Sequence, residues 1–240
     1  MKILKLTTVL ALAGCMLVQV GCSSMSNTGK GALIGGGGGA GLGAALGGII
    51  GGGKGAAIGA GIGAAVGTGA GALIGNKMDK AKKAAEAANA QAEVLTDKDG
   101  YAYVKATFPS GLLFASGKYA LNASAKNDLA TFARSLDADM DVCIYGYTDN
   151  DPWRGYTAEQ SVAKNQELSL QRAGAVRDQL LANGLQSSQI REISGLGESN
   201  PVASNATAQG KEQNRRVEVF ILPSKAMVEA ANAEAAAAKQ

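Results

Sequence analysis

The sequence has no histidine and only three cysteines among its 240 residues. A zinc site built from His and Cys ligands therefore cannot be assembled, and a hydrolytic triad that depends on histidine is excluded. The net charge is only +3, which is too small for a general nucleic-acid-binding surface. These absences argue against several enzyme classes and against nucleic acid as a partner, and we expect no metal and no cofactor. The length allows one ordinary domain with appendages.

The amino terminus (1–21) is predicted to be a lipoprotein signal peptide. A positively charged start, an apolar run over 6–20 and a small residue precede Cys22, which is the pattern of a secretory signal. A cysteine at this point resembles the lipobox of bacterial lipoproteins, where the thiol is acylated. We predict lipidation at Cys22, at the start of a polar tether over 22–30. The alternatives are Cys15, whose preceding residues match the motif more closely, an ordinary cleaved signal without a lipid, and an uncleaved anchor.

Lipidation would also decide how the chain is held at a membrane. With Cys22 acylated, Cys143 is the one thiol left in the mature chain, so no intramolecular disulfide can form. The charge of +3 less the two lysines of the leader gives +1. Acyl chains, and not attraction to anionic headgroups, would therefore anchor the protein.

Glycine recurs at every fourth position from residue 31 to residue 75, and we call this segment the glycine ladder. Residues 31–51 recur in similar form at 55–75, and two helices of about 20 residues would just cross a hydrocarbon core. Glycine lowers helix propensity by about 1 kcal/mol per residue relative to alanine. Close backbone contact between helices can offset this loss. We predict a membrane-associated helical hairpin that resembles bacterial glycine zippers and can self-associate; a flexible linker is the alternative.

The remaining chain divides into three parts. Residues 76–98 are charged and Ala-rich and are predicted to form a solvated helical connector. Turn residues at 96–100 mark the start of a folded domain over 99–223. An Ala-rich tail helix is expected over 224–240.

Within the folded domain, strands and helices are expected to alternate. Apolar residues at every second position predict a strand over 101–108, and helical spacing predicts a helix over 122–136. Further elements are predicted as strands at 142–147, 191–196 and 216–222, and as helices at 166–182 and 206–213. This order predicts a layer of helices against a sheet.

Polar motifs follow these elements at regular places. They read GYTDN at 146–150, NQELSLQRA at 165–173, GLGE at 195–198 and NRRVE at 214–218. In this order they resemble the carboxy-terminal domain of OmpA-like proteins, which peptidoglycan-associated lipoproteins share. The resemblance implies an α+β fold, an OmpA-like α/β sandwich with a mixed sheet. It also implies non-covalent binding of the diamino acid of peptidoglycan stem peptides, without enzymatic activity.

Two opposite charges are the central candidates for binding. Asp149 follows a strand, where its carboxylate can accept hydrogen bonds from a ligand ammonium, and the planar guanidinium of Arg172 suits a ligand carboxylate. The resemblance implies that Asn165 and Arg215 also contact this zwitterionic group. It further implies the wall residues Thr148, Asn150 and Leu168. The alternative is that Asp149 and Arg172 form a structural salt bridge and bind nothing.

The chain departs from the family pattern at several positions. The segment 151–164 is longer than in most relatives, Ala115 stands where many relatives have an acidic residue, and Lys211 replaces an arginine. Arg216 is expected at a solvated strand edge or in a core ion pair. Cys143 is expected to be a small buried hydrophobic residue and not a reactive thiol.

Together these features predict an outer-membrane lipoprotein of a Gram-negative bacterium, with its globular domain in the periplasm. Its expected partners are peptidoglycan and membrane lipid, and it would tether the membrane to the cell wall. The alternative function is a membrane-active or self-associating oligomer, in which the glycine ladder acts and the wall domain only positions it. An ion-conducting stator is excluded because such proteins need a membrane carboxylate, and residues 31–75 contain no Asp or Glu.

Overall fold

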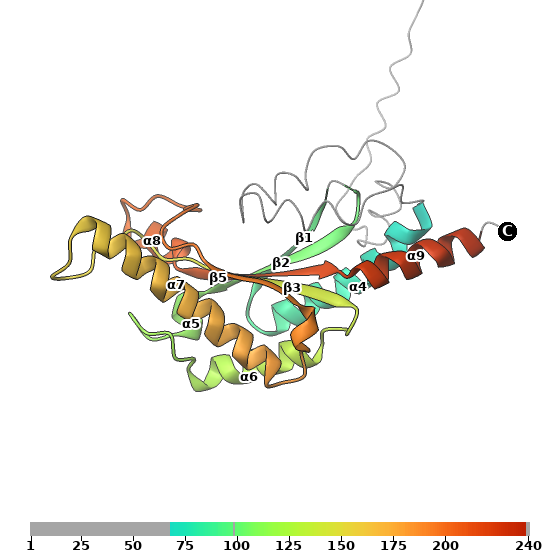
Figure 1. Cartoon of the computed structure of the whole chain (residues 1–240), viewed down its shortest axis with the longest axis horizontal. Coiled ribbons are helices and arrows are strands. Elements are labelled where there is room, and N and C mark those ends of the chain that lie inside the picture. Colours follow the sequence, from blue (N-terminus) through green and yellow to red (C-terminus); the bar gives the residue numbers. More distant parts are fainter. Residues whose placement is uncertain (1–67, 98, 239–240) are drawn as a thin grey trace, which may run out of the picture.

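The computed structural model describes residues 68–97 and 99–238 (Figure 1). The predicted signal peptide, the polar tether and residues 31–67 of the glycine ladder lie outside the described residues. The lipidation site and the membrane hairpin therefore stay predictions.

A five-stranded mixed sheet with the order β1-β2-β5-β3-β4 organises the described part of the chain. Its strands are β1 (Gln91–Thr96), β2 (Ala102–Pro109), β3 (Met140–Gly146), β4 (Ile190–Gly195) and β5 (Arg216–Pro223). Strand β5 pairs antiparallel with β2 and β3, whereas β3 pairs parallel with β4. The predicted α+β class with a mixed sheet is confirmed.

Alternate strand residues bury one face of the sheet under helices. Val142, Ile144, Val219 and Ile221 belong to the main hydrophobic core. Helices α6 (Ala123–Arg134) and α7 (Ala158–Leu181) lie on this side of the sheet in Figure 1. A second, smaller cluster on the opposite face consists of Tyr103, Cys143, Tyr145, Tyr147 and Phe220.

Helix α4 (Thr68–Ala87) differs from the solvated connector that the sequence led us to expect. It begins within the glycine ladder and buries one face, which consists of Ala70, Ile74, Met78, Ala81 and Ala85. The spacing of three and four residues places these side chains on one side of the helix, where α4 contacts β1, β2 and β5. Strand β1 then pairs with β2 along its whole length. The packed body therefore begins before residue 99.

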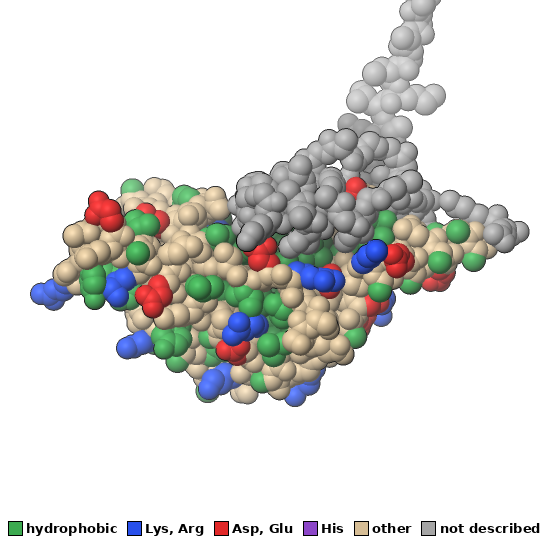
Figure 2. Space-filling view, in the orientation of Figure 1, with side chains coloured by type: hydrophobic (Ala, Val, Ile, Leu, Met, Phe, Trp, Pro, Cys, Tyr) green, Lys and Arg blue, Asp and Glu red, His purple; other side chains and the backbone are tan. Residues whose placement is uncertain are grey.

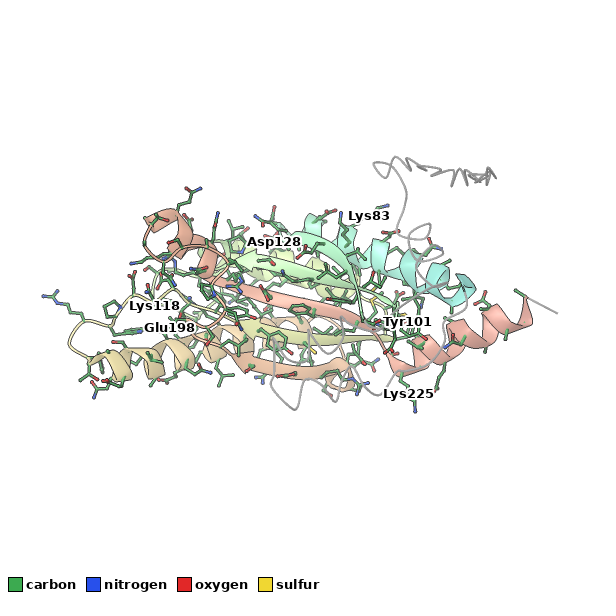
Figure 3. All side chains as sticks on the ribbon, turned by 90° about the horizontal axis from the view of Figure 1, so that it is seen from above. Lys83, Tyr101, Lys118, Asp128, Glu198 and Lys225 are labelled. Atoms are coloured by element: carbon green, nitrogen blue, oxygen red, sulfur yellow. The ribbon has the colours of Figure 1, made fainter. Side chains whose placement is uncertain are left out.

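The expected tail helix is α9 (Lys225–Ala237), and it packs against α4. Its buried side chains include Met227, Val228 and Ala231. Viewed from above, Lys118 and Glu198 lie toward one end of the molecule, and Tyr101 and Lys225 lie toward the end with α9 (Figure 3). The two chain segments that flank the domain thus meet at one end of the sheet.

On the side shown in Figure 2, basic and acidic side chains are interspersed. Within residues 68–97 and 99–238, no helix combines the length and the apolar character needed to span a bilayer.

Candidate ligand-binding site

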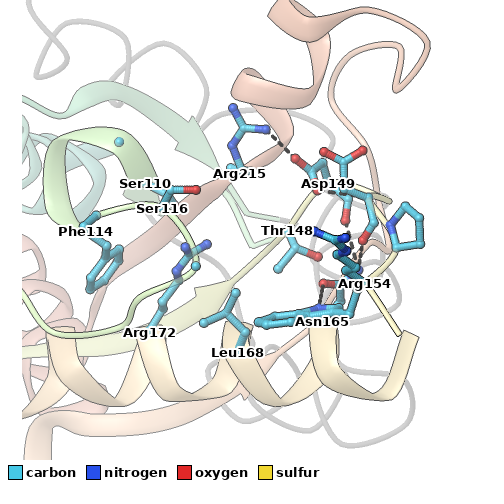
Figure 4. A pocket seen from close by; sticks show the side chains of 16 residues that line it. Ser110, Phe114, Ser116, Thr148, Asp149, Arg154, Asn165, Leu168, Arg172 and Arg215 are labelled. Carbon is cyan, nitrogen blue, oxygen red and sulfur yellow. Dashed lines mark hydrogen bonds and ion pairs between the residues drawn. The ribbon is translucent and has the colours of Figure 1, made fainter. Parts of the chain in front are cut away.

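A cavity of about 480 Å³ lies at the end of the molecule that is opposite α9. Its walls come from the segment after β2, from the segment after β3, from α7 and from Arg215 before β5. Figure 4 shows the side chains that line it. A volume of this size is typical of small-ligand pockets, which are about 300–1,000 Å³.

Backbone hydrogen bonds hold the chain after β3 in place. The Tyr147 N–H donates to the Arg216 carbonyl over 2.9 Å, and the Thr148 N–H donates to the Gly197 carbonyl over 2.8 Å. These bonds continue the sheet on both sides of the strand end. Thr148 and Asp149 are therefore fixed at the carboxyl end of β3, and both are buried.

Two glycines let helix α7 approach the sheet closely beside the cavity. Gly146 and Gly195 are register partners on β3 and β4. A Cβ atom on Gly146 would lie 2.0 Å from the Ser169 carbonyl oxygen, and one on Gly195 would lie 2.3 Å from the Leu170 nitrogen. Because only glycine fits at this distance, the helix turn that precedes Arg172 is fixed against the strand ends.

Asp149 forms an ion pair with Arg215 and not with Arg172. The Asp149 side chain is only 9% exposed, whereas that of Arg215 is 36% exposed. The Oδ1 atom of Asp149 also accepts a hydrogen bond from the Asp151 N–H over 3.1 Å. The structural salt bridge that we considered between Asp149 and Arg172 is therefore absent, and both side chains line the cavity.

Arg172 is a buried cation that lacks a carboxylate partner among the described residues. It is 3% exposed, its Nε donates to the Lys118 carbonyl over 3.0 Å, and its guanidinium carbon lies 5.3 Å from the centre of the Phe114 ring. Burial and the charge of Arg215 lower the pKa of Arg172, and Asp149 partly opposes this shift. An arginine nevertheless remains protonated. Figure 4 shows the Arg172 side chain extending from α7 toward the cavity.

Two buried hydroxyl groups of cavity-lining residues have no hydrogen-bond partner within the described part of the chain. They are Ser110 Oγ and Thr148 Oγ1, on residues that are 3% and 4% exposed. Buried polar atoms are normally satisfied, so these two have unused hydrogen-bonding capacity beside the cavity. The sequence analysis identified Thr148 as a wall residue but did not identify Ser110.

Asn165 and Asn150 take places other than those expected for ligand contacts. The Asn165 amide oxygen accepts from the Trp153 indole N–H over 2.8 Å, and its amide nitrogen donates to the carbonyls of Asp149 and Asp151. Its polar groups thus hold the segment after β3, although the residue lines the cavity. Asn150 is exposed and lies outside the cavity lining, while Leu168 lies within it.

Helix α7 begins well before the residue 166 that we expected. Thr157 caps it with a reciprocal pair of hydrogen bonds: its Oγ1 accepts from the Gln160 N–H over 3.3 Å, and its own N–H donates to the Gln160 side chain over 3.0 Å. This capping box fixes the helix start. The second half of the insertion 151–164 is therefore helical, and Arg172 lies in the middle of α7 and not at its start.

The residues that depart from the family pattern make specific contacts in the structure. Arg216 forms a buried ion pair with Glu218 over 2.8 Å and stacks on the Tyr147 ring at 3.7 Å. It therefore takes the core ion-pair role that we had considered. Lys211 pairs with Asp151, and Ala115 lines the cavity without supplying a charge.

The described chain is thus an α+β domain with a mixed sheet, helices on one face, and a cavity that is lined by opposite charges at the strand ends. Residues 113–215 match the OmpA family, and residues 1–79 match the YMGG-like Gly-zipper family. These two matches confirm the resemblance to OmpA-like proteins and to glycine zippers that was seen in the sequence motifs.

Individual relatives agree with this assignment. The outer-membrane lipoprotein YfiB of Pseudomonas aeruginosa is 39% identical over 114 residues, which are 47% of this chain and 62% of that protein. The peptidoglycan-binding protein ArfA of Mycobacterium tuberculosis is 45% identical over 83 residues, or 35% of this chain and 23% of that protein. The chain spans less than two thirds of the length of either relative.

A solved structure shows the same fold. The crystal structure described as that of a MotB-like protein from Desulfovibrio vulgaris has a TM-score of 0.51 at 22% identity. The match covers 63% of this chain and 96% of that chain. At this identity the likeness concerns the fold.

Proposed function

We propose that this protein binds peptidoglycan non-covalently and thereby tethers the outer membrane to the cell wall. The ligand group would be the diamino acid of a stem peptide, which offers an ammonium and a carboxylate at one centre. The observation that carries the proposal is Arg172, a buried cation that faces a cavity with no carboxylate partner among the described residues. An unpaired buried charge costs several kcal/mol, and a ligand carboxylate would remove that cost.

Binding of this group follows from the charges around the cavity. The terminal nitrogens of Arg172 hold the ligand carboxylate, since its Nε is already bonded to Lys118. Asp149 accepts from the ligand ammonium, and Arg215, its present partner, can stay or turn to the carboxylate. The hydroxyls of Ser110 and Thr148 complete the polar contacts. No bond is made or broken, so the domain acts as a binding module and not as an enzyme.

The anchor is the second half of the proposal. Acylation of Cys22, or of Cys15 as the alternative, would hold the protein in the outer membrane, with the folded domain in the periplasm. The glycine ladder would add contact with lipid and permit self-association. The matches to an outer-membrane lipoprotein and to a glycine-zipper family support this arrangement. The mass of the mature amino terminus tests it directly.

The wall-binding half is tested by Arg172→Ala in a pull-down with purified peptidoglycan. Losing a buried charged partner costs at least about 2 kcal/mol, so retention should fall at least about thirtyfold. Because the same change removes an unpaired buried charge, the midpoint of thermal unfolding should stay equal or rise. Asp149→Ala should also lose binding. Arg134→Ala, an exposed arginine on α6, is the matched control.

Two results would contradict the proposal. Wild-type retention by a folded Arg172→Ala protein would show that the cavity does not hold the wall. A marked loss of stability together with binding would assign Arg172 a structural role instead.

A further inference from the structure

The insertion that precedes α7 forms one wall of the cavity through Trp153. The indole N–H donates to Asn165 Oδ1 over 2.8 Å, and the Trp153 main-chain N–H donates to Ser161 Oγ over 3.0 Å. Both acceptors belong to α7 and both residues are 4% exposed. Trp153 is thus held against the helix by two hydrogen bonds, and it lines the cavity with Leu168 and Arg172.

Further contacts fix the rest of this segment. The Lys164 ammonium lies 5.6 Å from the centre of the Trp153 ring and 4.6 Å from the centre of the Tyr156 ring. Asp151, two residues before Trp153, pairs with Lys211 of helix α8 (Ala208–Asn214). The segment is therefore tied to two helices, and the wall exists before a ligand arrives. Preformed walls reduce the entropy lost on binding.

Trp153 precedes α7, and its indole is bonded to Asn165 on this helix. The place of Asn165 along α7 indicates which part of a ligand the indole can contact. The helix carries three cavity-lining residues at intervals of three and four, namely Asn165, Leu168 and Arg172. They therefore lie on one face of the helix. Seven residues of helix span about 10 Å. The indole, bonded to Asn165, therefore lies about 10 Å along the helix from the Arg172 position, with the apolar Leu168 between them.

We infer that Trp153 is a specificity-determining residue, which contacts the stem peptide beyond the zwitterionic centre held by Asp149 and Arg172. The ligand class is a short peptide that continues from the diamino acid, and its backbone or an apolar side chain packs on the indole. This inference rests on the proposed function. It adds a second contact region, which makes a stem peptide a better ligand than the free diamino acid.

Trp153 is the single tryptophan of the chain, so its fluorescence reports on the cavity without labelling. The full chain in detergent is titrated with free meso-diaminopimelate and with a synthetic stem tripeptide that ends in the same diamino acid. We expect a saturable change in emission with the tripeptide. Calorimetry gives the affinities of variants that lack the indole.

Three variants test the contact. Trp153→Ala should weaken tripeptide binding about five- to tenfold, which is the size of an aromatic contact, and leave diaminopimelate binding within about twofold. Trp153→Phe keeps the ring but loses the hydrogen bond to Asn165, and it should retain most of the tripeptide affinity. Tyr119→Ala, the matched control, changes an exposed ring outside the cavity lining and outside the segment that holds Trp153 and should alter neither affinity.

The possible failures are distinguishable. If the wild-type protein binds neither probe, the proposed function fails as a whole. If it binds both but Trp153→Ala weakens both equally or neither, the inference is overturned while the proposed function stands. If Trp153→Phe behaves like Trp153→Ala, the residue only anchors the segment through Asn165, and the inference is again overturned.

Discussion

Asp149 and Arg172 line the same cavity, yet only Asp149 has an ion-pair partner among the described residues. This difference between the two residues, one paired and one not, has a physical reason. A protein that needs a cation for its own stability pairs it, whereas a binding site keeps it available at some cost in stability. The two unpaired hydroxyls in the same wall, on Ser110 and Thr148, follow the same logic.

Gly146 determines how closely helix α7 lies to the sheet. Gly146→Ala places a methyl group 2.0 Å from the Ser169 carbonyl oxygen, so α7 or β3 must move. We expect a loss of about 1–3 kcal/mol in the free energy of unfolding, measured by denaturant titration. Gly174→Ala, also on α7 but with open space around the new Cβ, should stabilise the protein by about 0.5–1 kcal/mol. Equal effects of the two changes would contradict this account of the contact.

At the scale of elements, the local patterns identified most of the domain. Strand alternation and helical spacing located β2, α6, β3, β4, α8 and β5 to within a few residues. Local patterns could not predict the order of the strands in the sheet, because strand pairing depends on residues that are far apart in the chain. The pairing of Asp149 with Arg215, 66 residues later, is of the same kind.

The start of the packed body was missed for a different reason. Alanine is ambiguous: the buried Ala70, Ala81 and Ala85 of α4 look in the sequence like those of a solvated helix. The turn taken as a domain boundary is in fact a hairpin turn. Asp97 accepts hydrogen bonds from the main-chain N–H groups of Asp99 and Tyr101, and these close β1 onto β2. A turn motif alone cannot tell a linker from a hairpin.

The packing of α4 on the sheet leads to a prediction about this helix. Ile74 is 0% exposed, so Ile74→Ala in the full chain should lower the free energy of unfolding by about 2–5 kcal/mol. Lys80→Ala, on an exposed position of the same helix, should change it by less than about 0.5 kcal/mol. Thermal unfolding in detergent gives both values. Were α4 an independent spacer, the two variants would unfold alike.

At the scale of the whole molecule, the start of the described chain and the candidate site lie at opposite ends. Helix α4, which continues from the glycine ladder, packs beside α9 at one end of the sheet. The cavity lies at the other end, where Ser116 and Gly117, the two residues before Lys118, line it. The proposed tether would transmit force through the body between its two ends. The sheet, packed against α4 and α7, provides that body here.

The second face of this sheet controls how the whole molecule responds to alkaline pH. Burial, aided by the charge of Glu192, raises the pKa of Cys143 to about 12. Burial likewise raises the pKa values of Tyr103, Tyr145 and Tyr147. In the unfolded chain, thiols and phenols ionise near about 8.5 and 10. The folded state therefore holds protons that the unfolded state has lost.

This difference fixes the sign of the pH dependence. Because the folded pKa values are raised, the stabilisation is complete below about pH 8.5 and is lost as pH rises toward the folded values. Each such group contributes up to about 1.4 kcal/mol per pH unit. We expect the thermal midpoint to be flat from about pH 7 to 8 and to fall steeply between about pH 9 and 11.

Tyr103→Phe isolates one of these groups. Burial and the charges of Asp97 and Glu93 raise the pKa of the Tyr103 phenol, and the variant removes this phenol. It keeps the ring that stacks on Phe220. The variant should unfold like the wild type at pH 7, and above about pH 10 its stability should fall with a slope smaller by about one proton. Circular dichroism melts across this range measure both slopes. Identical slopes would mean that Tyr103 ionises in the folded protein as it does in the unfolded chain, and that this face of the sheet is open to water.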